Sequence, residues 1–262
     1  MARQELYTLF DPKPGCCISS LAYEYPADHN VPEHAHRAAQ LIYATRGVMQ
    51  IAVGASLWVI PPQFAIWMPP RIAHSIHMPG AVSMRTLYFR RGLADRLPQA
   101  CTVLHVSALL RELVLEGVRI GALLTREPLH RALRDLLIAQ VRISTPVPTS
   151  LTLPNDPRAL GAARAFIADP SSRQTLDELC RSNGASVRTI ERVFRSEVGT
   201  SFEEWRAQVR MMKAIELLVA GRTVKETAFE VGYRQPSAFV EMFRRTLGST
   251  PKAWIKSLGA YS

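Results

Sequence analysis

The sequence is 262 residues long and has no long hydrophobic run. Its apolar stretches are shorter and more interrupted than the roughly 20 residues that a membrane-spanning helix needs, so we expect no membrane partner. Residues 1–5 lead into no apolar targeting segment, and no secretory signal is therefore expected. Together these absences predict a cytoplasmic protein.

Cysteine is scarce, with four residues at positions 16, 17, 101 and 180. None of them forms a C-x-x-C pair or another zinc-binding spacing. Cys16 and Cys17 are adjacent, which suits a reducing compartment better than a disulfide framework.

Basic residues are in excess over acidic ones: the net charge is +10 and the isoelectric point is near 9.9. Such a balance fits a polyanionic partner. Both halves of the chain are basic, and the bias is sharpest over residues 206–262, with ten basic and four acidic residues. Basic surfaces are common, so the charge fits nucleic acid without identifying it.

The first 95 residues alternate between apolar and polar side chains in the manner of strands. The segments are short, rich in β-branched and aromatic residues, and separated by Gly or Pro turns. The predicted strands are Gln40–Thr45, Val48–Val53, Leu57–Ile60, Phe64–Met68, Ser75–Met78 and Met84–Phe89. Several short strands in series predict a barrel or a sandwich.

The period becomes helical between residues 106 and 143, where apolar stripes run over Leu109–Val118 and Leu129–Val141. Residues 144–154 contain three prolines and five hydroxyl side chains but no charge, which predicts a linker. Everything after the linker has a helical pattern. The two stripes pack either on the barrel or across a dimer, and the sequence leaves both open.

Two stretches of the helical region match each other 48 to 49 residues apart. Thr175–Glu178 and Thr223–Glu226 are both capping boxes, which begin helices. Gly184 and Gly232 follow them as turns, and a second helix comes after each. This repeat predicts two helix-turn-helix units, at about 175–197 and 223–246, joined by one continuous helix over residues 203–220.

A rigid spacer of this kind lets two recognition helices enter successive major grooves of DNA. Arg188 and Arg192 can each make bidentate bonds to a guanine edge, and Glu191 can accept from cytosine. Residues better suited to holding phosphates are Arg195, Arg244 and Arg245. On the second helix, Arg234 and Ser237 are also expected to face outward.

The C-terminal segment resembles the DNA-binding domain of the AraC/XylS family of bacterial regulators over residues 158–257. The residues that carry the resemblance are Ala228, Val231-Gly232-Tyr233, Phe239, Phe243-Arg244, Gly248, Pro251 and Trp254. The resemblance implies base contacts from Arg188, Glu191 and Arg192 in the first unit, and from Gln235, Pro236, Ser237 and Glu241 in the second. Glu241 departs from the family, which often has a basic residue there, so the first helix is expected to carry most of the specificity.

The N-terminal part is similar to the two motifs of the cupin barrel. Pro32-Glu33-His34-Ala35-His36 precedes Gln40 and Gly47, and Pro69-Pro70-Arg71 precedes His74. In metal-binding cupins these motifs supply three histidines and a glutamate, and here Gln40 takes the place of the glutamate. The resemblance implies a site for zinc, nickel or iron at His34, His36, Gln40 and His74. The alternative is that the histidines line an effector pocket without metal.

Aromatic side chains of the barrel are a second candidate for effector contact. These are Tyr43, Trp58, Trp67 and Tyr88. Each of them taken singly also fits an ordinary barrel core, and the sequence does not name a ligand.

These observations predict an α+β protein of several domains. A cupin-like β-barrel (1–95) binds an effector or metal, a helical segment (96–143) is a candidate for dimerisation, a linker (144–154) follows, and an all-α DNA-binding domain (155–262) completes the chain. The main hypothesis is a homodimeric, nucleoid-associated transcription regulator, without enzymatic activity, that binds promoter DNA under the control of a small effector or metal ion. If it activates transcription, RNA polymerase is a further partner. The alternative is a metal-dependent cupin enzyme fused to a DNA-binding domain.

Overall fold

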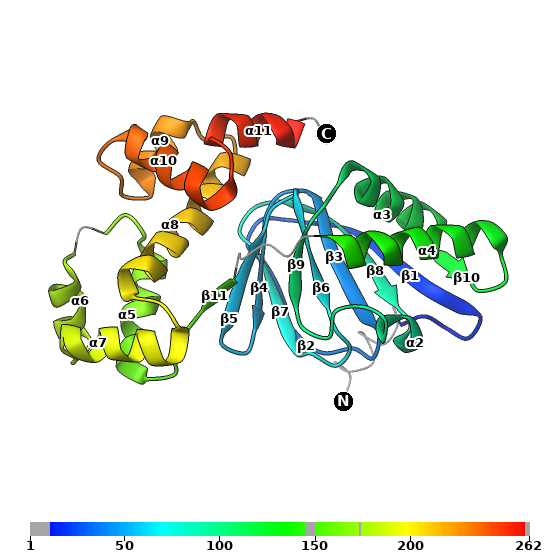
Figure 1. Cartoon of the computed structure of the whole chain (residues 1–262), viewed down its shortest axis with the longest axis horizontal. Coiled ribbons are helices and arrows are strands. Elements are labelled where there is room, and N and C mark those ends of the chain that lie inside the picture. Colours follow the sequence, from blue (N-terminus) through cyan, green and yellow to red (C-terminus); the bar gives the residue numbers. More distant parts are fainter. Residues whose placement is uncertain (1–10, 145–149, 173, 260–262) are drawn as a thin grey trace. The chain divides into compact units, whose positions relative to one another are not determined.

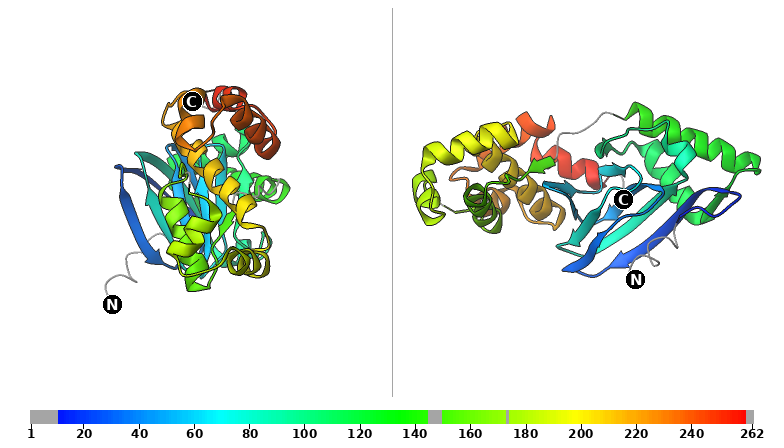
Figure 2. Two further views of the ribbon diagram at one scale, coloured as in Figure 1. Left: turned by 90° about the vertical axis from the view of Figure 1, so that its left-hand side faces the viewer. Right: turned by 90° about the horizontal axis from the view of Figure 1, so that it is seen from below.

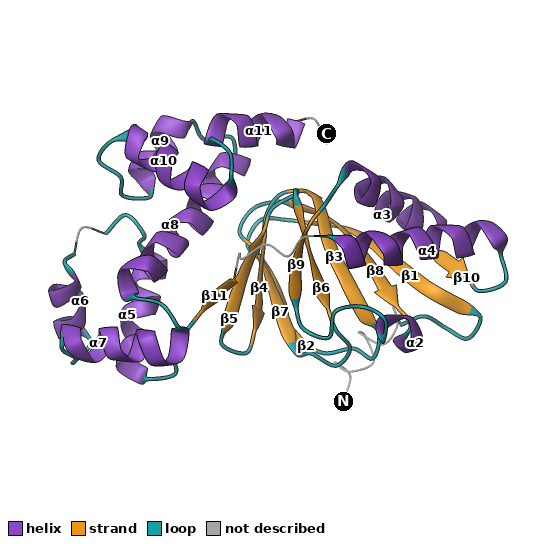
Figure 3. Ribbon diagram, in the orientation of Figure 1, coloured by secondary structure: helices purple, strands orange, loops and turns teal. Residues whose placement is uncertain are grey.

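The structure is a computed structural model that describes residues 11–144, 150–172 and 174–259. The described chain forms two compact units. The N-terminal unit holds residues 11–54 and 58–144, and the C-terminal unit holds residues 55–57, 150–172 and 174–259. Strands dominate the first unit and helices dominate the second (Figure 3), as the sequence predicts.

The strands form two antiparallel sheets (Figure 1). Their bounds are β1 (Cys16–Tyr25), β2 (His29–His34), β3 (Ala39–Arg46), β4 (Met49–Val53), β5 (Ser56–Ile60), β6 (Phe64–Met68), β7 (His74–Met78), β8 (Val82–Phe89), β9 (Thr102–His105), β10 (Ala122–Leu124) and β11 (Ser150–Thr152). The six-stranded sheet has the order β10-β1-β8-β3-β6-β9, and the five-stranded sheet has the order β11-β5-β4-β7-β2. All six predicted strands are present, as β3 to β8.

Alternation along the strands of the six-stranded sheet builds two apolar clusters. On β3, Leu41 and Tyr43 point to one face of the sheet, and Ile42 and Ala44 point to the other. The first pair joins a cluster with the helices that cover that face, which Figure 2 shows on the right. The second pair packs against the five-stranded sheet, where Ile76 of β7 belongs to the same cluster. The interior between the two sheets is therefore one of the two cores of the unit.

The helices of the N-terminal unit within residues 11–144 are α2 (Arg91–Ala94), α3 (Ala108–Ile120) and α4 (Pro128–Ile143). Most of the two apolar stripes predicted from the sequence packs onto the six-stranded sheet, since Leu110, Leu113, Leu133 and Leu137 are buried there. The apolar side chains that α3 and α4 leave exposed are Leu109, Leu129, Leu136 and Ile143.

The C-terminal unit contains α5 (Pro157–Ala168), α6 (Leu176–Ser182), α7 (Val187–Val193), the π-helical turn η1 (Phe194–Val198), α8 (Phe202–Val219), α9 (Val224–Glu230), α10 (Pro236–Leu247) and α11 (Pro251–Gly259). Both predicted capping boxes are present, at the starts of α6 and α9. A third, formed by Ser201 and Glu204, begins α8. Gly184 and Gly232 have φ of +67° and +87°, the left-handed conformation that the turns require. The repeat thus forms two helix-turn-helix units, α6–α7 and α9–α10.

Helix α8 supplies the core of the C-terminal unit. Trp205 is fully buried, stacks on Phe202 and lies edge-on to Phe194. Its indole nitrogen donates a hydrogen bond to the carbonyl oxygen of Thr152, 2.9 Å away. Thr152 belongs to β11, so the predicted linker contains a strand, and residues 145–149 of that linker lie outside the described residues.

Candidate metal centre and DNA interface

Three histidines from separate segments meet in the interior between the two sheets. His34 is the last residue of β2, His36 lies in the following loop, and His74 is the first residue of β7. One ring nitrogen from each lies within 4.8 Å of those of the other two, and the ring centroids of His34 and His74 are 4.3 Å apart. Among the described residues, this is the one group of chelating side chains of this size.

The backbone fixes the same orientation for each of the three rings. In every case Nδ1 lies against the carbonyl oxygen of a residue two positions away, at 2.9 Å for His34, 2.7 Å for His36 and 2.9 Å for His74. A carbonyl oxygen can only accept, so Nδ1 carries the proton and a neutral ring keeps the lone pair on Nε2. Hydrogen bonds of this kind orient the histidine ligands of metal sites.

Gln40 of β3 adds a fourth ligand atom from the six-stranded sheet. The Thr86 hydroxyl donates to the Leu41 carbonyl oxygen at 3.0 Å, so it accepts from the Gln40 amide nitrogen at 2.9 Å. This leaves the amide oxygen of Gln40 facing Nε2 of His36 at 2.7 Å. The role of Thr86 has no signal in the sequence, because β8 is far from β3 along the chain.

Burial keeps two of the rings neutral. It lowers the pKa of His74 to about 3 and also lowers the pKa of His34, so both rings are unprotonated at neutral pH. Nε2 of His74 is buried and has no hydrogen-bond partner among the described residues, although the Nδ1 side of the ring is bonded. A buried lone pair without a donor is what a metal ligand presents before the ion is bound, so the residues fit a divalent metal.

The four residues reach this site from separate parts of the fold. β2 and β3 belong to different sheets, and His36 lies between them. The site forms because the chain crosses from one sheet to the other at this point. His77, three residues after His74, pairs instead with Asn30 at an exposed position.

The four candidate aromatic residues do not form one pocket. Tyr43 and Trp67 lie in the cluster under α3 and α4, whereas Trp58 lies in the cluster between the sheets. Tyr88 is the one that meets the histidines, since its ring lies edge-on to His36 with centroids 5.4 Å apart. Of the four, Tyr88 is therefore placed to contact a ligand at this site.

The first recognition helix, α7, presents a basic surface. Arg188 and Arg192 on α7 and Arg195 on the following turn η1 are exposed, as the sequence predicts. Glu191 is turned inward, because one of its carboxylate oxygens is buried without a hydrogen-bond partner, and its charge contributes to raising the pKa of Cys180 on α6. Glu191 must change rotamer before it can accept from a base.

The second recognition helix, α10, begins with Pro236 in its first turn. The other predicted contact residues of this unit are all exposed: Arg234, Gln235, Ser237, Glu241, Arg244 and Arg245. Inward-facing Phe239, Met242 and Phe243 hold the helix on the core.

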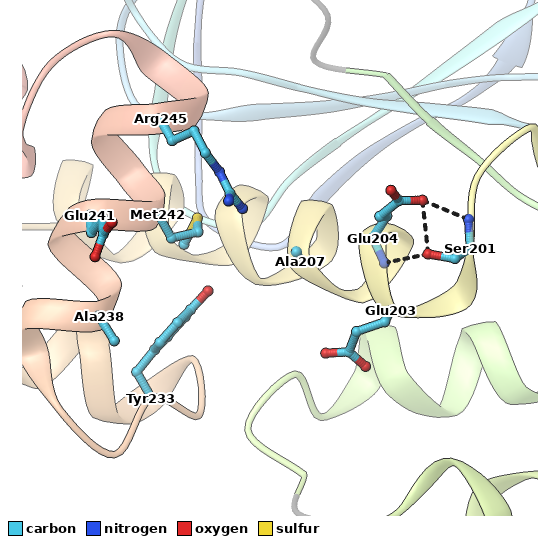
Figure 4. A pocket seen from close by; sticks show the side chains of 9 residues that line it. All are labelled: Ser201, Glu203, Glu204, Ala207, Tyr233, Ala238, Glu241, Met242 and Arg245. Atoms are coloured by element: carbon cyan, nitrogen blue, oxygen red, sulfur yellow. Dashed lines mark hydrogen bonds between the residues drawn. The ribbon is translucent and has the colours of Figure 1, made fainter.

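An open hollow of about 680 Å³ lies between α10 and the start of α8 (Figure 4). Glu203 and Glu204 line its α8 side, and Glu241 and Arg245 line its α10 side. The guanidinium of Arg245 and the hydroxyl of Tyr233 point into it. Glu204 is committed to the capping box with Ser201, but the hollow still places three carboxylates beside the second recognition helix.

Comparison with known proteins agrees with both parts of this arrangement. The family model of the AraC-like ligand binding domain matches residues 18–151, and that of a helix-turn-helix domain matches residues 179–257. The HTH-type transcriptional regulator NimR of Escherichia coli (strain K12) is 30% identical over 231 residues, which cover 88% of this chain and 84% of NimR. RipA of Corynebacterium glutamicum is 34% identical over 108 residues, 41% of this chain and 32% of RipA.

Among solved structures, ToxT from Vibrio cholerae O395 is similar, with 13% identity, a TM-score of 0.40 and coverage of 92% of this chain and 99% of ToxT. A similarity this distant supports no conclusion about the ligand. The two family matches and the relation to NimR show that the chain belongs to the AraC family of transcriptional regulators. It has an N-terminal ligand-binding domain and a C-terminal helix-turn-helix DNA-binding domain. Within the described residues, none of the helices is long and apolar enough to cross a membrane.

Proposed function

We propose that this regulator responds to a divalent metal ion held by His34, His36, Gln40 and His74. The observation that carries the proposal is the convergence of one ring nitrogen from each of three histidines, with Nε2 of His74 buried and without a hydrogen-bond partner among the described residues. Three imidazole nitrogens and an amide oxygen suit zinc, nickel or iron(II). The bound ion ties β2 and β7 of one sheet to β3 of the other, so it stiffens the domain at the crossing between the sheets.

A regulatory role for this site is better supported than catalysis. Metal-dependent hydrolysis or proton transfer needs a general acid or base near the ion. Gln40 does not titrate, Glu33 is exposed, and the group of chelating side chains among the described residues contains no carboxylate. The known relatives are transcription regulators, which supports the same reading. The protein is thus a sensor that works on promoter DNA in the cytoplasm, without turnover of its ligand.

The DNA-binding domain reads two successive major grooves unequally. Arg188 and Arg192 on α7 contact base edges, and Arg195 binds phosphate. On α10, Gln235 and Ser237 reach the second groove, while Arg234, Arg244 and Arg245 contact the backbone. Glu241 on α10 opposes phosphate there, so α7 supplies most of the specificity. Of the other two carboxylates at the hollow, Glu203 is ion-paired with Arg206 and Glu204 belongs to the capping box with Ser201.

The regulator forms a homodimer through the exposed face of α4. Positions 129, 132, 136, 139 and 143 are Leu, Ala, Leu, Ala and Ile, all exposed, at the alternating spacing of three and four residues that defines a coiled-coil seam. In the dimer, the α4 helices of the two copies run antiparallel, and Leu136 of each copy packs against Ala139 of the other. In this register Asp135 of each copy faces Arg142 of the other copy. Asp135 also bonds to Arg134 of its own helix, so this contact shares an existing pair.

Metal content tests the proposed sensor. Protein purified without chelators is expected to contain about one metal ion per chain by elemental analysis, and His74→Ala is expected to lose it. His77→Ala is the matched control, because it removes an imidazole from the same strand at an exposed position bonded to Asn30. Metal-free wild-type protein that cannot be loaded with zinc, nickel or iron(II) would overturn the proposal.

A further inference from the structure

We infer that the effector of this domain is a small carboxylate that binds to the metal ion, and that Gln40 creates the need for it. This inference rests on the proposed metal site. The four ligand groups are three imidazoles and an amide, and all of them are neutral when they donate a lone pair. No carboxylate belongs to the described group. A bound divalent ion therefore keeps its full charge of +2.

The surroundings do not neutralise that charge. Of the four ligands, His36, Gln40 and His74 are buried, with exposed fractions of 4%, 2% and 0%. An ion with an uncompensated charge is strongly disfavoured in such an environment, because little water reaches it. An anion in the coordination shell removes most of this penalty.

The charged residues around the loop of His36 balance one another. Arg37 is exposed beside His36, and Glu33 is exposed beside His34. The backbone N–H of Arg71 donates to the His36 carbonyl oxygen at 2.8 Å, and the backbone N–H of Ala38 donates to the Asp11 carboxylate at 3.2 Å. These two arginines and two carboxylates together carry no net charge, so they do not take the place of an anion on the metal.

His34 is half-buried, while the other three ligand residues are buried. Four protein ligands leave room for one or two further donors around nickel or iron, and zinc expands to five. A carboxylate suits such a position because its oxygen is a ligand that all three ions accept.

Arg71 provides a second anchor for the carboxylate. It is one of two non-glycine residues among those described with a positive φ, at +65°, and it follows two prolines. A strained residue held by a hydrogen bond to a ligand loop marks a functional position. Its exposed guanidinium offers the paired donors that match the two oxygens of a carboxylate.

Cobalt(II)-loaded protein tests this inference directly, with acetate as the anion and acetamide as its neutral counterpart. Acetate is expected to change the visible absorption of the bound cobalt in a saturable way, and acetamide is expected to leave it unchanged. Gln40→Glu supplies the missing charge from the protein, so it is expected to bind cobalt at least as tightly and to weaken acetate binding by about tenfold or more. Arg71→Gln, an exposed change, is expected to weaken acetate binding severalfold without loss of cobalt.

The outcomes separate the two proposals. Protein that binds no cobalt contradicts the metal site itself, and the carboxylate inference falls with it. Protein that binds cobalt but shows no spectral response to acetate leaves the metal site standing and overturns the inference. An equal response of wild type and Gln40→Glu, with cobalt bound in both, also overturns it. Should Gln40→Glu fail to fold, wild-type protein decides, because an equal spectral response of the bound cobalt to acetate and to acetamide overturns the inference.

Discussion

Nε2 of His36 lies 2.7 Å from the amide oxygen of Gln40, within hydrogen-bond distance. The Nδ1 proton of His36 is committed to the carbonyl oxygen of Ala38, and the amide of Gln40 is oriented by Thr86. The contact of His36 with Gln40 joins the loop of His36 to β3, and it brings the amide oxygen of Gln40 to the group of three histidines.

Leu136→Glu is expected to convert the dimer into a monomer, because it puts a charge at the centre of the α4 seam. Light scattering of the purified protein measures the mass. Phe229→Glu on α9 is the matched control, since Phe229 and Leu136 are each 47% exposed in the single chain. Asp135→Arg and Arg142→Asp are each expected to weaken the dimer, and the double exchange is expected to restore it. A dimer that persists in Leu136→Glu would place the interface elsewhere.

Gly47→Ala is expected to destabilise the N-terminal unit by about 3 kcal/mol or more. Gly47 has φ of +83°, and an added Cβ would lie 2.2 Å from the Ala81 carbonyl oxygen. Gly54 has φ of +55° but open space around it, so Gly54→Ala is expected to cost about 1–2 kcal/mol. Urea unfolding gives both values, and equal losses in the two variants would mean that the close approach to Ala81 is unimportant.

Local signals in the sequence predict much of the fold. Both capping boxes and the proline at the start of α10 favour the start of a helix through interactions over three or four residues. These helix starts can therefore be predicted without knowledge of tertiary contacts. Strands β3 to β8 are predicted because their apolar faces are buried. The strands that are not predicted are β1, β2, β9, β10 and β11. Strand β2 is polar and largely exposed, and β9, β10 and β11 are too short to show a period.

In the site, too, the sequence indicates which residues take part, whereas tertiary contacts determine how their side chains are oriented. The three histidines are found through their motif, but the orientation of each ring depends on backbone carbonyls that no side-chain pattern reveals. Thr86 orients Gln40 only because β3 and β8 are paired. The inward turn of Glu191 likewise follows from the packing of α7 near Cys180, whereas helical spacing alone predicts an exposed carboxylate.

Arg192→Ala is expected to reduce discrimination at one base pair by about 1–3 kcal/mol. The reason is that Arg192 lies exposed on α7, and an arginine guanidinium can donate two hydrogen bonds to the edge of a guanine. Affinities for a set of operators with single base changes provide the measurement. Arg164→Ala removes the same charge from the exposed side of α5 and is expected to leave the discrimination intact. A uniform loss over all operators would make Arg192 a phosphate contact.

Glu241→Gln is expected to strengthen DNA binding severalfold at low salt, and the gain is expected to shrink as salt rises. It removes one of the three carboxylates beside the second recognition helix. Glu112→Gln on α3, also exposed, is the control for an acidic side chain in the other unit. Weaker binding that depends on a single base pair would show instead that Glu241 reads a cytosine.

The most direct test of the whole account is the affinity of the protein for DNA from upstream of its own gene, measured by fluorescence anisotropy with and without metal. A regulator that senses metal through the histidine site should change its Kd by about fivefold or more on loading. This change should vanish in His74→Ala and persist in His77→Ala. Equal affinities for metal-free and metal-loaded wild-type protein, with metal content verified in the same samples, would contradict the account.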